Sequence, residues 1–120
     1  NLDARRDFTY VSDTVNGFLC AASVTGVEGD TFNLGVGQEI RIGELVNEVI
    51  SLTGRAVELK MDENRLRPEK SEVQRLISDN RHAREHLGWC PMVGLREGLQ
   101  NTIQWIEKHL NLYRPGQYQV

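Results

Sequence analysis

The sequence predicts a small α/β unit of α+β character, in which helices pack on a few short strands. Apolar residues recur with helical spacing in three segments, 14–24, 42–53 and 95–110, and such spacing gives a helix one apolar face. Short runs of β-branched and aromatic residues lie before and between these segments and favour strands. A length of 120 residues fits one domain with its own hydrophobic core.

The chain begins with a predicted strand and a predicted helix. The run Phe-Thr-Tyr-Val at 8–11 is β-prone and ends at Ser12 and Asp13, either of which can cap a helix. The helix predicted over 14–24 has apolar residues at positions i, i+3, i+4 and i+7, and it ends near Gly26.

The middle of the chain predicts a strand, a helix and a second strand. The run 31–35, Thr-Phe-Asn-Leu-Gly, lies between glycine-containing turns. The amphipathic helix over 42–53 is followed by Gly54, which suits a left-handed C-terminal cap. Residues 57–61 alternate like a half-buried strand.

This succession looks like a dinucleotide-binding βαβ unit. In such a unit, glycines let the backbone approach a pyrophosphate, and a later acid, here Asp62, binds the ribose. The third glycine should lie three residues after Gly37, but Ile40 occupies that position, and the loop before the helix is too long for the tight turn. We therefore interpret Gly35 and Gly37 as turn formers and expect no cofactor binding there.

The second half of the chain predicts a loop and two further helices. Residues 62–72 are polar and contain a proline, so we expect a loop, followed by a brief extended piece at 76–77. Asp79 is the expected cap of a short helix that reaches Leu87. The last helix is predicted over 95–110.

Aromatic residues and histidines in this half have simple structural interpretations. Trp89 and Trp105 are expected in the core, where they would pack the last two helices together. His82 and His86 have the spacing of a metal pair, but there is no H-E-x-x-H pattern. We expect solvent-facing histidines and no metal site.

Composition argues against two classes of partner. The formal net charge of −3 provides no basic field for nucleic acid, and no apolar run approaches the roughly 20 residues that span a bilayer. We therefore expect neither nucleic acid nor a membrane as a partner. No signal-peptide pattern precedes the fold. Cys20 and Cys90 lack the spacing of a metal or redox motif, so we expect reduced thiols in a cytoplasmic protein.

Two arginines in predicted loops are the candidate ligand-binding residues. Guanidinium groups bind phosphate oxygens in bidentate geometry. Arg6 and Arg67, entering from separate loops, would clamp both phosphates of a diphosphate. The alternative is that each is a solvated surface arginine, one of 14 basic residues in the chain.

Several motifs occur in a definite order: Arg-Asp-Phe-Thr-Tyr-Val-Ser-Asp at 6–13, Arg-Pro-Glu-Lys-Ser-Glu-Val at 67–73, Ser-Asp-Asn at 78–80 and Leu-Gly-Trp-Cys-Pro at 87–91. Together they resemble the C-terminal third of nucleotide-sugar 4,6-dehydratases and epimerases, in the extended short-chain dehydrogenase/reductase family. The likeness leans toward the GDP-mannose 4,6-dehydratase-like branch. It implies a nucleotide-sugar-binding C-terminal domain over 1–112 and a tail over 113–120.

The resemblance implies roles for the candidate residues of both loops. It places Arg6 on the nucleoside diphosphate and makes Arg67 the second phosphate-binding arginine. Glu72 would accept the hydroxyls of the ribose. Because the loop is slightly longer here than in many relatives, Ser71 or Glu69 can take that role instead.

Three further positions are compared with the family. Asn33, at the end of a predicted strand, would either hydrogen-bond the ligand or stabilise its own turn, and both interpretations stay open. Arg41 occupies the place of the family's capping Ser or Thr before the helix at 42–53, and Gly94 replaces the capping Ser before the last helix. Loss of a capping hydroxyl costs about 0.5–2 kcal/mol.

The family's chemistry needs a glycine-rich cofactor loop and a Tyr-x-x-x-Lys pair, and the sequence contains neither. The resemblance therefore implies a parent enzyme, a lyase that uses NAD or NADP, whose Rossmann cofactor domain is absent from this chain. The fragment alone would bind no cofactor and be inactive, and the parent would form a homodimer through the missing domain. A 4-epimerase fragment and a stand-alone, non-catalytic binding module are the alternatives.

Overall fold

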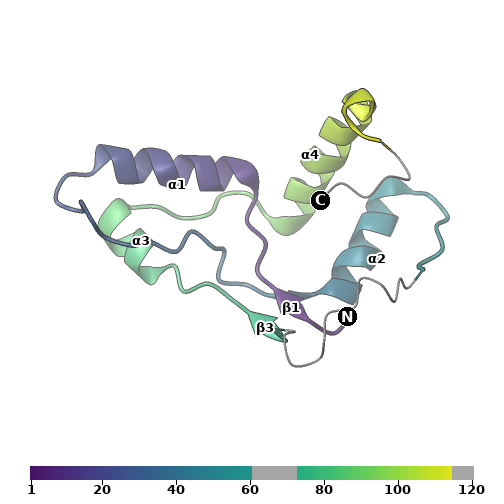
Figure 1. Cartoon of the computed structure of the whole chain (residues 1–120), viewed down its shortest axis with the longest axis horizontal. Coiled ribbons are helices and arrows are strands. Elements are labelled where there is room, and N and C mark those ends of the chain that lie inside the picture. Colours follow the sequence, from purple (N-terminus) through teal and green to yellow (C-terminus); the bar gives the residue numbers. More distant parts are fainter. Residues whose placement is uncertain (61–72, 115–120) are drawn as a thin grey trace.

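The computed structural model describes residues 1–60 and 73–114. Two-residue strands and longer helices follow one another along the chain in Figure 1: β1 (Arg5–Arg6), α1 (Val11–Ser23), β2 (Ile40–Arg41), α2 (Ile42–Thr53), β3 (Arg75–Leu76), α3 (Arg81–Leu87), α4 (Leu95–Lys108) and the 3-10 helix η3 (Leu110–Leu112). The predicted α/β class is confirmed. Within the described ranges, no helix has the length and apolar character needed to cross a membrane.

A three-stranded sheet joins segments that are far apart in the sequence. Its strand order is β2-β1-β3, with β1 antiparallel to β2 and parallel to β3. The register gives each residue of β1 one partner on either side: Arg5 pairs with Arg41 and Arg75, and Arg6 pairs with Ile40 and Leu76.

The hydrophobic core lies between α1 and α3, which run side by side in Figure 1. It is formed by Ala83, Leu87 and Trp89, with partly buried residues of α1 and of the following segment packed against them. The Trp89 side chain is 1% exposed, and its Nε1 donates to the carbonyl of Asp13 at 2.9 Å. Trp89 is therefore a core anchor as predicted, but it joins the end of α3 to α1.

The last helix begins at the predicted residue and ends earlier than predicted. α4 runs from Leu95 to Lys108, and the chain continues as η3. Trp105 is 49% exposed and stacks on His109, with ring centroids 4.4 Å apart. The predicted core position of Trp105 is wrong, since its side of α4 faces solvent.

The first strand and the first helix both differ from the prediction. The strand is Arg5–Arg6, and residues 8–10 are irregular because α1 already begins at Val11. Tyr10, with extended backbone angles, is the residue before the helix. Asp13 therefore lies inside the first turn of α1, where its buried carboxylate accepts the backbone N–H of Val93 at 3.0 Å.

The two strands predicted around α2 are not formed in the described residues. Segment 31–35 is irregular: the Leu34 carbonyl accepts from Thr9 Oγ1 at 3.2 Å and the Gly35 carbonyl from Asn80 Nδ2 at 2.7 Å. In this segment, hydrogen bonds from side chains therefore take the place of the backbone hydrogen bonds that would join two strands. Residues 57–60 are exposed and irregular, and residue 61 lies outside the described part. The βαβ unit suggested by the sequence therefore does not form there.

The two helices that flank β3 in the chain agree more closely with the sequence. α2 covers the predicted 42–53, and Gly54 has the expected left-handed conformation at φ 62°. α3 starts at Arg81, one residue later than predicted, because Asn80 and not Asp79 is its cap residue. Asp79 contributes by accepting the backbone N–H of Arg81 at 3.1 Å.

Candidate functional site

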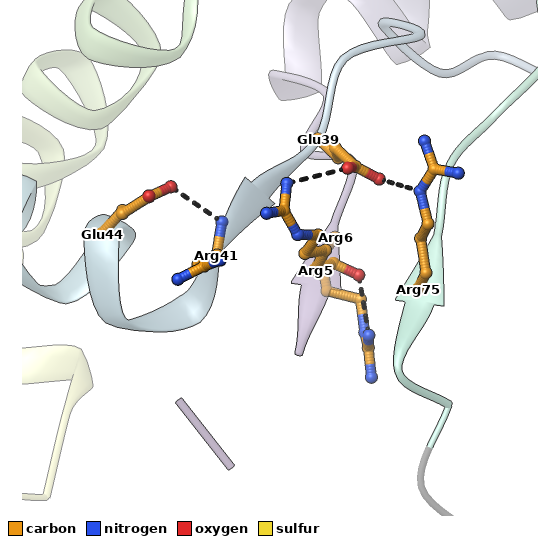
Figure 2. Close-up of polar contacts among 6 residues, drawn as sticks. All are labelled: Arg5, Arg6, Glu39, Arg41, Glu44 and Arg75. Carbon is orange, nitrogen blue, oxygen red and sulfur yellow. Dashed lines mark hydrogen bonds and ion pairs between the residues drawn. The ribbon is translucent and has the colours of Figure 1, made fainter. Parts of the chain in front are cut away.

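Arg6 is held on the central strand of the sheet, a more rigid place than the predicted loop. Its Nη1 donates to the carbonyl of Arg5 at 2.8 Å, so the guanidinium turns back along its own strand (Figure 2). Its register partners Ile40 and Leu76 are both apolar. A charged group on a paired strand is positioned by the backbone hydrogen bonds of two neighbours.

The other residues assigned to the diphosphate and ribose fall outside the described part of the chain. These are Arg67, Glu72 and the alternatives Ser71 and Glu69. Their roles stay predictions. The described residues resume at Val73. The carbonyl of the following residue, Gln74, accepts the backbone N–H of Arg5 at 2.8 Å.

Asp7, the residue after Arg6, binds three backbone N–H groups from two other segments. Its Oδ1 accepts from Val36 at 3.1 Å, and its Oδ2 accepts from Gly37 at 2.8 Å and from Ser78 at 3.1 Å. The segments before β2 and after β3 are thereby tied to the end of β1. The glycine loop that resembles a pyrophosphate cradle binds this internal carboxylate, a role that the sequence analysis missed.

Both glycines of this loop are needed for the arrangement. A Cβ atom on Gly35 would lie 2.1 Å from Cβ of Ser78 and 2.9 Å from Oδ2 of Asp7, so only glycine allows the segments to approach. Gly37 has φ +79°, a left-handed conformation that glycine adopts without strain. Their interpretation as turn formers agrees with this geometry.

A cleft of about 550 Å³ lies beside the sheet. It is lined by the segment that follows β1, the loop before β2, α3 and the start of α4, including Phe8, Gln38, Ile40, Arg84 and Leu95. Phe8 is two residues from Arg6 in the sequence, and Ile40 is the register partner of Arg6. The lining offers an aromatic ring, an amide, a guanidinium and the carboxylate of Glu39, so a ligand with both apolar and polar parts would suit it.

Asn33 is placed apart from this cleft. Its Nδ2 donates to the carbonyl of Asp79 at 3.4 Å, which links the irregular segment 31–35 to the start of α3. It lines a separate shallow hollow together with Arg81, His82 and Glu85. This contact favours the turn-stabilising interpretation, while a contact with ligand stays a prediction.

A second charged cluster lies on the same sheet. The carboxylate of Glu39 accepts from Nη1 of Arg5 at 2.9 Å and from Nε of Arg75, as Figure 2 shows. The hydrogen bond from Arg75 lowers the pKa of the Glu39 carboxyl, burial opposes this shift, and Arg5 adds to the lowering. The sequence analysis missed this cluster because its members are separated by more than 30 positions.

The remaining polar groups give no sign of a metal centre in the described ranges. No group of three or more His, Cys, Asp or Glu side chains there could hold an ion. His82 instead stacks on Phe32, with ring centroids 4.8 Å apart, and its Nε2 lies 3.8 Å from a carboxylate oxygen of Asp30. Hydrogen bonds from Arg81 lower the pKa of Asp79 to about 2.

Comparison with known proteins assigns this arrangement to a class. A family model described as GDP-mannose 4,6 dehydratase matches residues 1–102. A UDP-glucose 4-epimerase of Mycolicibacterium smegmatis is 35% identical over 100 residues, covering 83% of this chain and 30% of the relative. The solved UDP-glucose 4-epimerase of Thermotoga maritima with UDP-glucose is 32% identical with a TM-score of 0.80, covering 92% of this chain and 34% of that one. The Bordetella bronchiseptica enzyme WbmF in complex with NADH is 30% identical with a TM-score of 0.75, covering 92% of this chain and 32% of that one.

These likenesses show the family: similar proteins are NAD-dependent nucleotide-sugar epimerases and dehydratases of the extended short-chain dehydrogenase/reductase type. The chain belongs to the GDP-mannose 4,6-dehydratase family. Other similar proteins are named as a dTDP-4-dehydro-6-deoxyglucose reductase, a UDP-glucuronic acid decarboxylase and a dTDP-D-glucose 4,6-dehydratase. The chain spans about a quarter to a third of the length of these relatives.

Proposed function

We propose that residues 1–112 bind the nucleoside diphosphate of a nucleotide sugar, as part of an NAD(P)-dependent nucleotide-sugar 4,6-dehydratase. The observation that carries the proposal is Arg6, a guanidinium on the central strand of the sheet, whose register partner Ile40 and near neighbour Phe8 line a cleft of about 550 Å³. Solved relatives with the same fold hold UDP-glucose, UDP-glucuronic acid or UDP. A diphosphate is the part that these ligands share, and arginine is well suited to bind it.

The position of β3 also supports a second contribution, from the segment that contains Arg67 and Glu72. In the sequence this segment directly precedes Val73 and then β3, the parallel neighbour of β1. Two segments far apart in the sequence therefore meet beside Arg6. This supports the proposal that Arg67 binds the second phosphate and that Glu72 accepts the ribose hydroxyls. With its diphosphate and ribose bound, the nucleotide sugar would have its sugar ring positioned for reaction.

NAD or NADP would supply the hydride acceptor of the parent enzyme. The glycine loop at 35–37 does not fit that cofactor, because the N–H groups that a pyrophosphate needs are bound by Asp7. We therefore place cofactor binding in the part of the parent enzyme that lies outside these residues. The homodimer and the cytoplasmic location stay predictions.

A 4-epimerase is the second candidate for the parent enzyme. The matching family model favours a dehydratase, whereas the relatives from M. smegmatis and T. maritima are named as epimerases. Incubating the longer protein that contains this chain with NAD and a nucleotide sugar separates the two. A dehydratase yields a 4-keto-6-deoxy sugar with loss of water, and an epimerase yields an isomer of unchanged mass. If neither product is formed, the result favours a stand-alone binding module.

Calorimetry on the 120-residue chain tests the binding site itself. We expect UDP, GDP or dTDP to bind with micromolar to millimolar Kd, and the corresponding nucleosides, which lack phosphate, to bind far more weakly. Arg6→Gln should weaken the best ligand about tenfold or more, since a charge-assisted hydrogen bond contributes about 1.5–3 kcal/mol. Arg55→Gln, at an exposed position after α2, is the matched control. Equal effects of the two substitutions would remove Arg6 from the site.

A further inference from the structure

Phe8 is an exposed aromatic residue whose two neighbours in the chain are anchored. It is 39% exposed and lines the cleft of about 550 Å³. Asp7 accepts three backbone N–H groups, and Thr9 donates through Oγ1 to the Leu34 carbonyl at 3.2 Å. Within the described residues no other aromatic ring stacks on Phe8. The phenyl ring is therefore presented to the cleft from a backbone that hydrogen bonds fix on both sides.

A second wall of the cleft is apolar and is anchored in the same way. It is formed by residues 91–95, with Met92 and Leu95 among its apolar side chains. The backbone N–H of Val93 donates to the buried carboxylate of Asp13 at 3.0 Å. Ligand sites of this size are typically pre-formed and lined mainly by apolar and aromatic groups. The cleft can thus receive a flat, largely apolar group without rearrangement of its walls.

The polar side chains of the cleft differ in what they have left to offer. Among the described lining residues they are Gln38, Glu39 and Arg84. Glu39 is occupied, because its two oxygens accept from Arg5 and Arg75 (Figure 2). The side chains of Gln38 and Arg84 make no hydrogen bond or ion pair within the described part of the chain. An amide and a guanidinium are therefore the groups available to a ligand.

This combination suits a nucleobase better than a sugar ring. A hexose carries a hydroxyl group on most of its carbons, and a cleft with two available polar side chains would leave several of them without a partner. A nucleobase has two flat faces and a few polar atoms along its edge, and its faces stack on aromatic side chains. Phe8 provides a stacking surface, and Gln38 and Arg84 provide partners for the edge.

We propose that the cleft binds the nucleobase of the nucleotide, and that Arg84 is a specificity-determining residue for bases with a carbonyl oxygen: guanine, uracil and thymine. This inference rests on the proposed function and adds the class of base to it. A guanidinium has donors and no acceptor. Guanine offers the acceptors O6 and N7, to which an arginine donates two hydrogen bonds, whereas adenine has an amino group in place of O6.

The first test compares GDP with ADP by calorimetry on the unaltered chain. Both are purine diphosphates, so phosphate contacts and stacking contribute equally and the ratio of the two Kd values reports the edge of the base. We expect GDP to bind about tenfold more tightly than ADP. Arg84→Met should bring the two Kd values to within about twofold, and Arg55→Met, at an exposed position after α2, should leave the ratio unchanged.

A conservative variant separates donor geometry from charge. Arg84→Lys keeps the positive charge but lacks the planar pair of donors, so we expect GDP to be preferred only about threefold. Equal binding of GDP and ADP by the unaltered chain would overturn the inference, and so would a tenfold preference that persists in a folded Arg84→Met chain.

The second test asks whether the base lies on Phe8. Phe8→Leu keeps an apolar side chain but removes the aromatic face, and should weaken GDP and UDP about tenfold. Pyrophosphate, which has no base, should bind as before. Phe18→Leu is the matched control, because Phe18 lies on α1, is 68% exposed and does not line the cleft. Equal Kd values for the Phe8 and Phe18 variants would overturn the inference.

The two tests distinguish failure of this inference from failure of the proposed function. If GDP and ADP bind alike and far more tightly than guanosine and adenosine, the diphosphate site stands and the assignment of the cleft to the base is wrong. If no nucleoside diphosphate binds the folded chain, the proposed function is refuted and this inference falls with it.

Discussion

Replacing Asp7 with asparagine removes the charge that ties three segments together beside Arg6. The native carboxylate accepts three backbone N–H groups at 2.8–3.1 Å. Asparagine has a single side-chain oxygen, so in either orientation its NH₂ group faces at least one backbone donor. A hydrogen bond to a charged group contributes about 1.5–3 kcal/mol, and a neutral one about 0.5–1.5 kcal/mol. One lost bond and two weakened ones should together cost about 3–5 kcal/mol.

This loss is large against a typical stability of about 5–15 kcal/mol. Urea unfolding, followed by tryptophan fluorescence and extrapolated to water, measures the free energy of unfolding. Asp3→Asn is the matched control, because Asp3 is exposed and its carboxylate makes no hydrogen bond within the described part of the chain. We expect the control to change stability by no more than about 0.5 kcal/mol. An Asp7→Asn chain as stable as the control would refute the reasoning.

Three further predictions concern the core and the surface. Trp89→Phe should lower the free energy of unfolding by about 2 kcal/mol or more, because the ring loses volume in the core and its hydrogen bond to Asp13, and urea unfolding measures this. Gly35→Ala should destabilise the chain far more than Gly→Ala at an open position, since its methyl group would overlap a neighbouring side chain, and the same assay compares them. Arg81→Gln should raise the pKa of Asp79 from about 2 toward 3.8 in an NMR titration, and an unchanged pKa would exclude Arg81 as the cause. The stabilisation from Asp79 is present above pH 3.8 and should be lost as the pH falls through about 2.

The helices could be predicted because their signals are local. The 3.6-residue spacing of apolar side chains and a following glycine fix α2 and Gly54 within the sequence itself. The starts of the helices were less accurate, as α1 and α3 show. The signals there were Ser12, Asp13 and Asp79, which can cap a helix but lie inside α1 or one residue before the true cap.

The strands and the charged contacts could not be predicted in the same way. A strand of two residues, such as β1 or β3, is too short to show an alternating pattern. Asp7 and Glu39 act on partners that lie between 29 and 71 positions away. The sequence does not show how close such residues lie in space or in which direction their side chains point. Arg6 could be distinguished from a solvated surface arginine only through a resemblance of motifs, and its place on the central strand came from the structure.

The central claim is that a nucleoside diphosphate binds beside Arg6, and NMR mapping tests it most directly. Backbone amide signals of the labelled 120-residue chain are recorded during titration with UDP or GDP. The account predicts that the largest shifts fall on β1, on residues 36–40 and on the segment that starts at Val73, and that Arg6→Gln strongly reduces them at the same ligand concentration. Shifts confined to the hollow around Asn33 and His82, or unchanged by Arg6→Gln, would contradict the account.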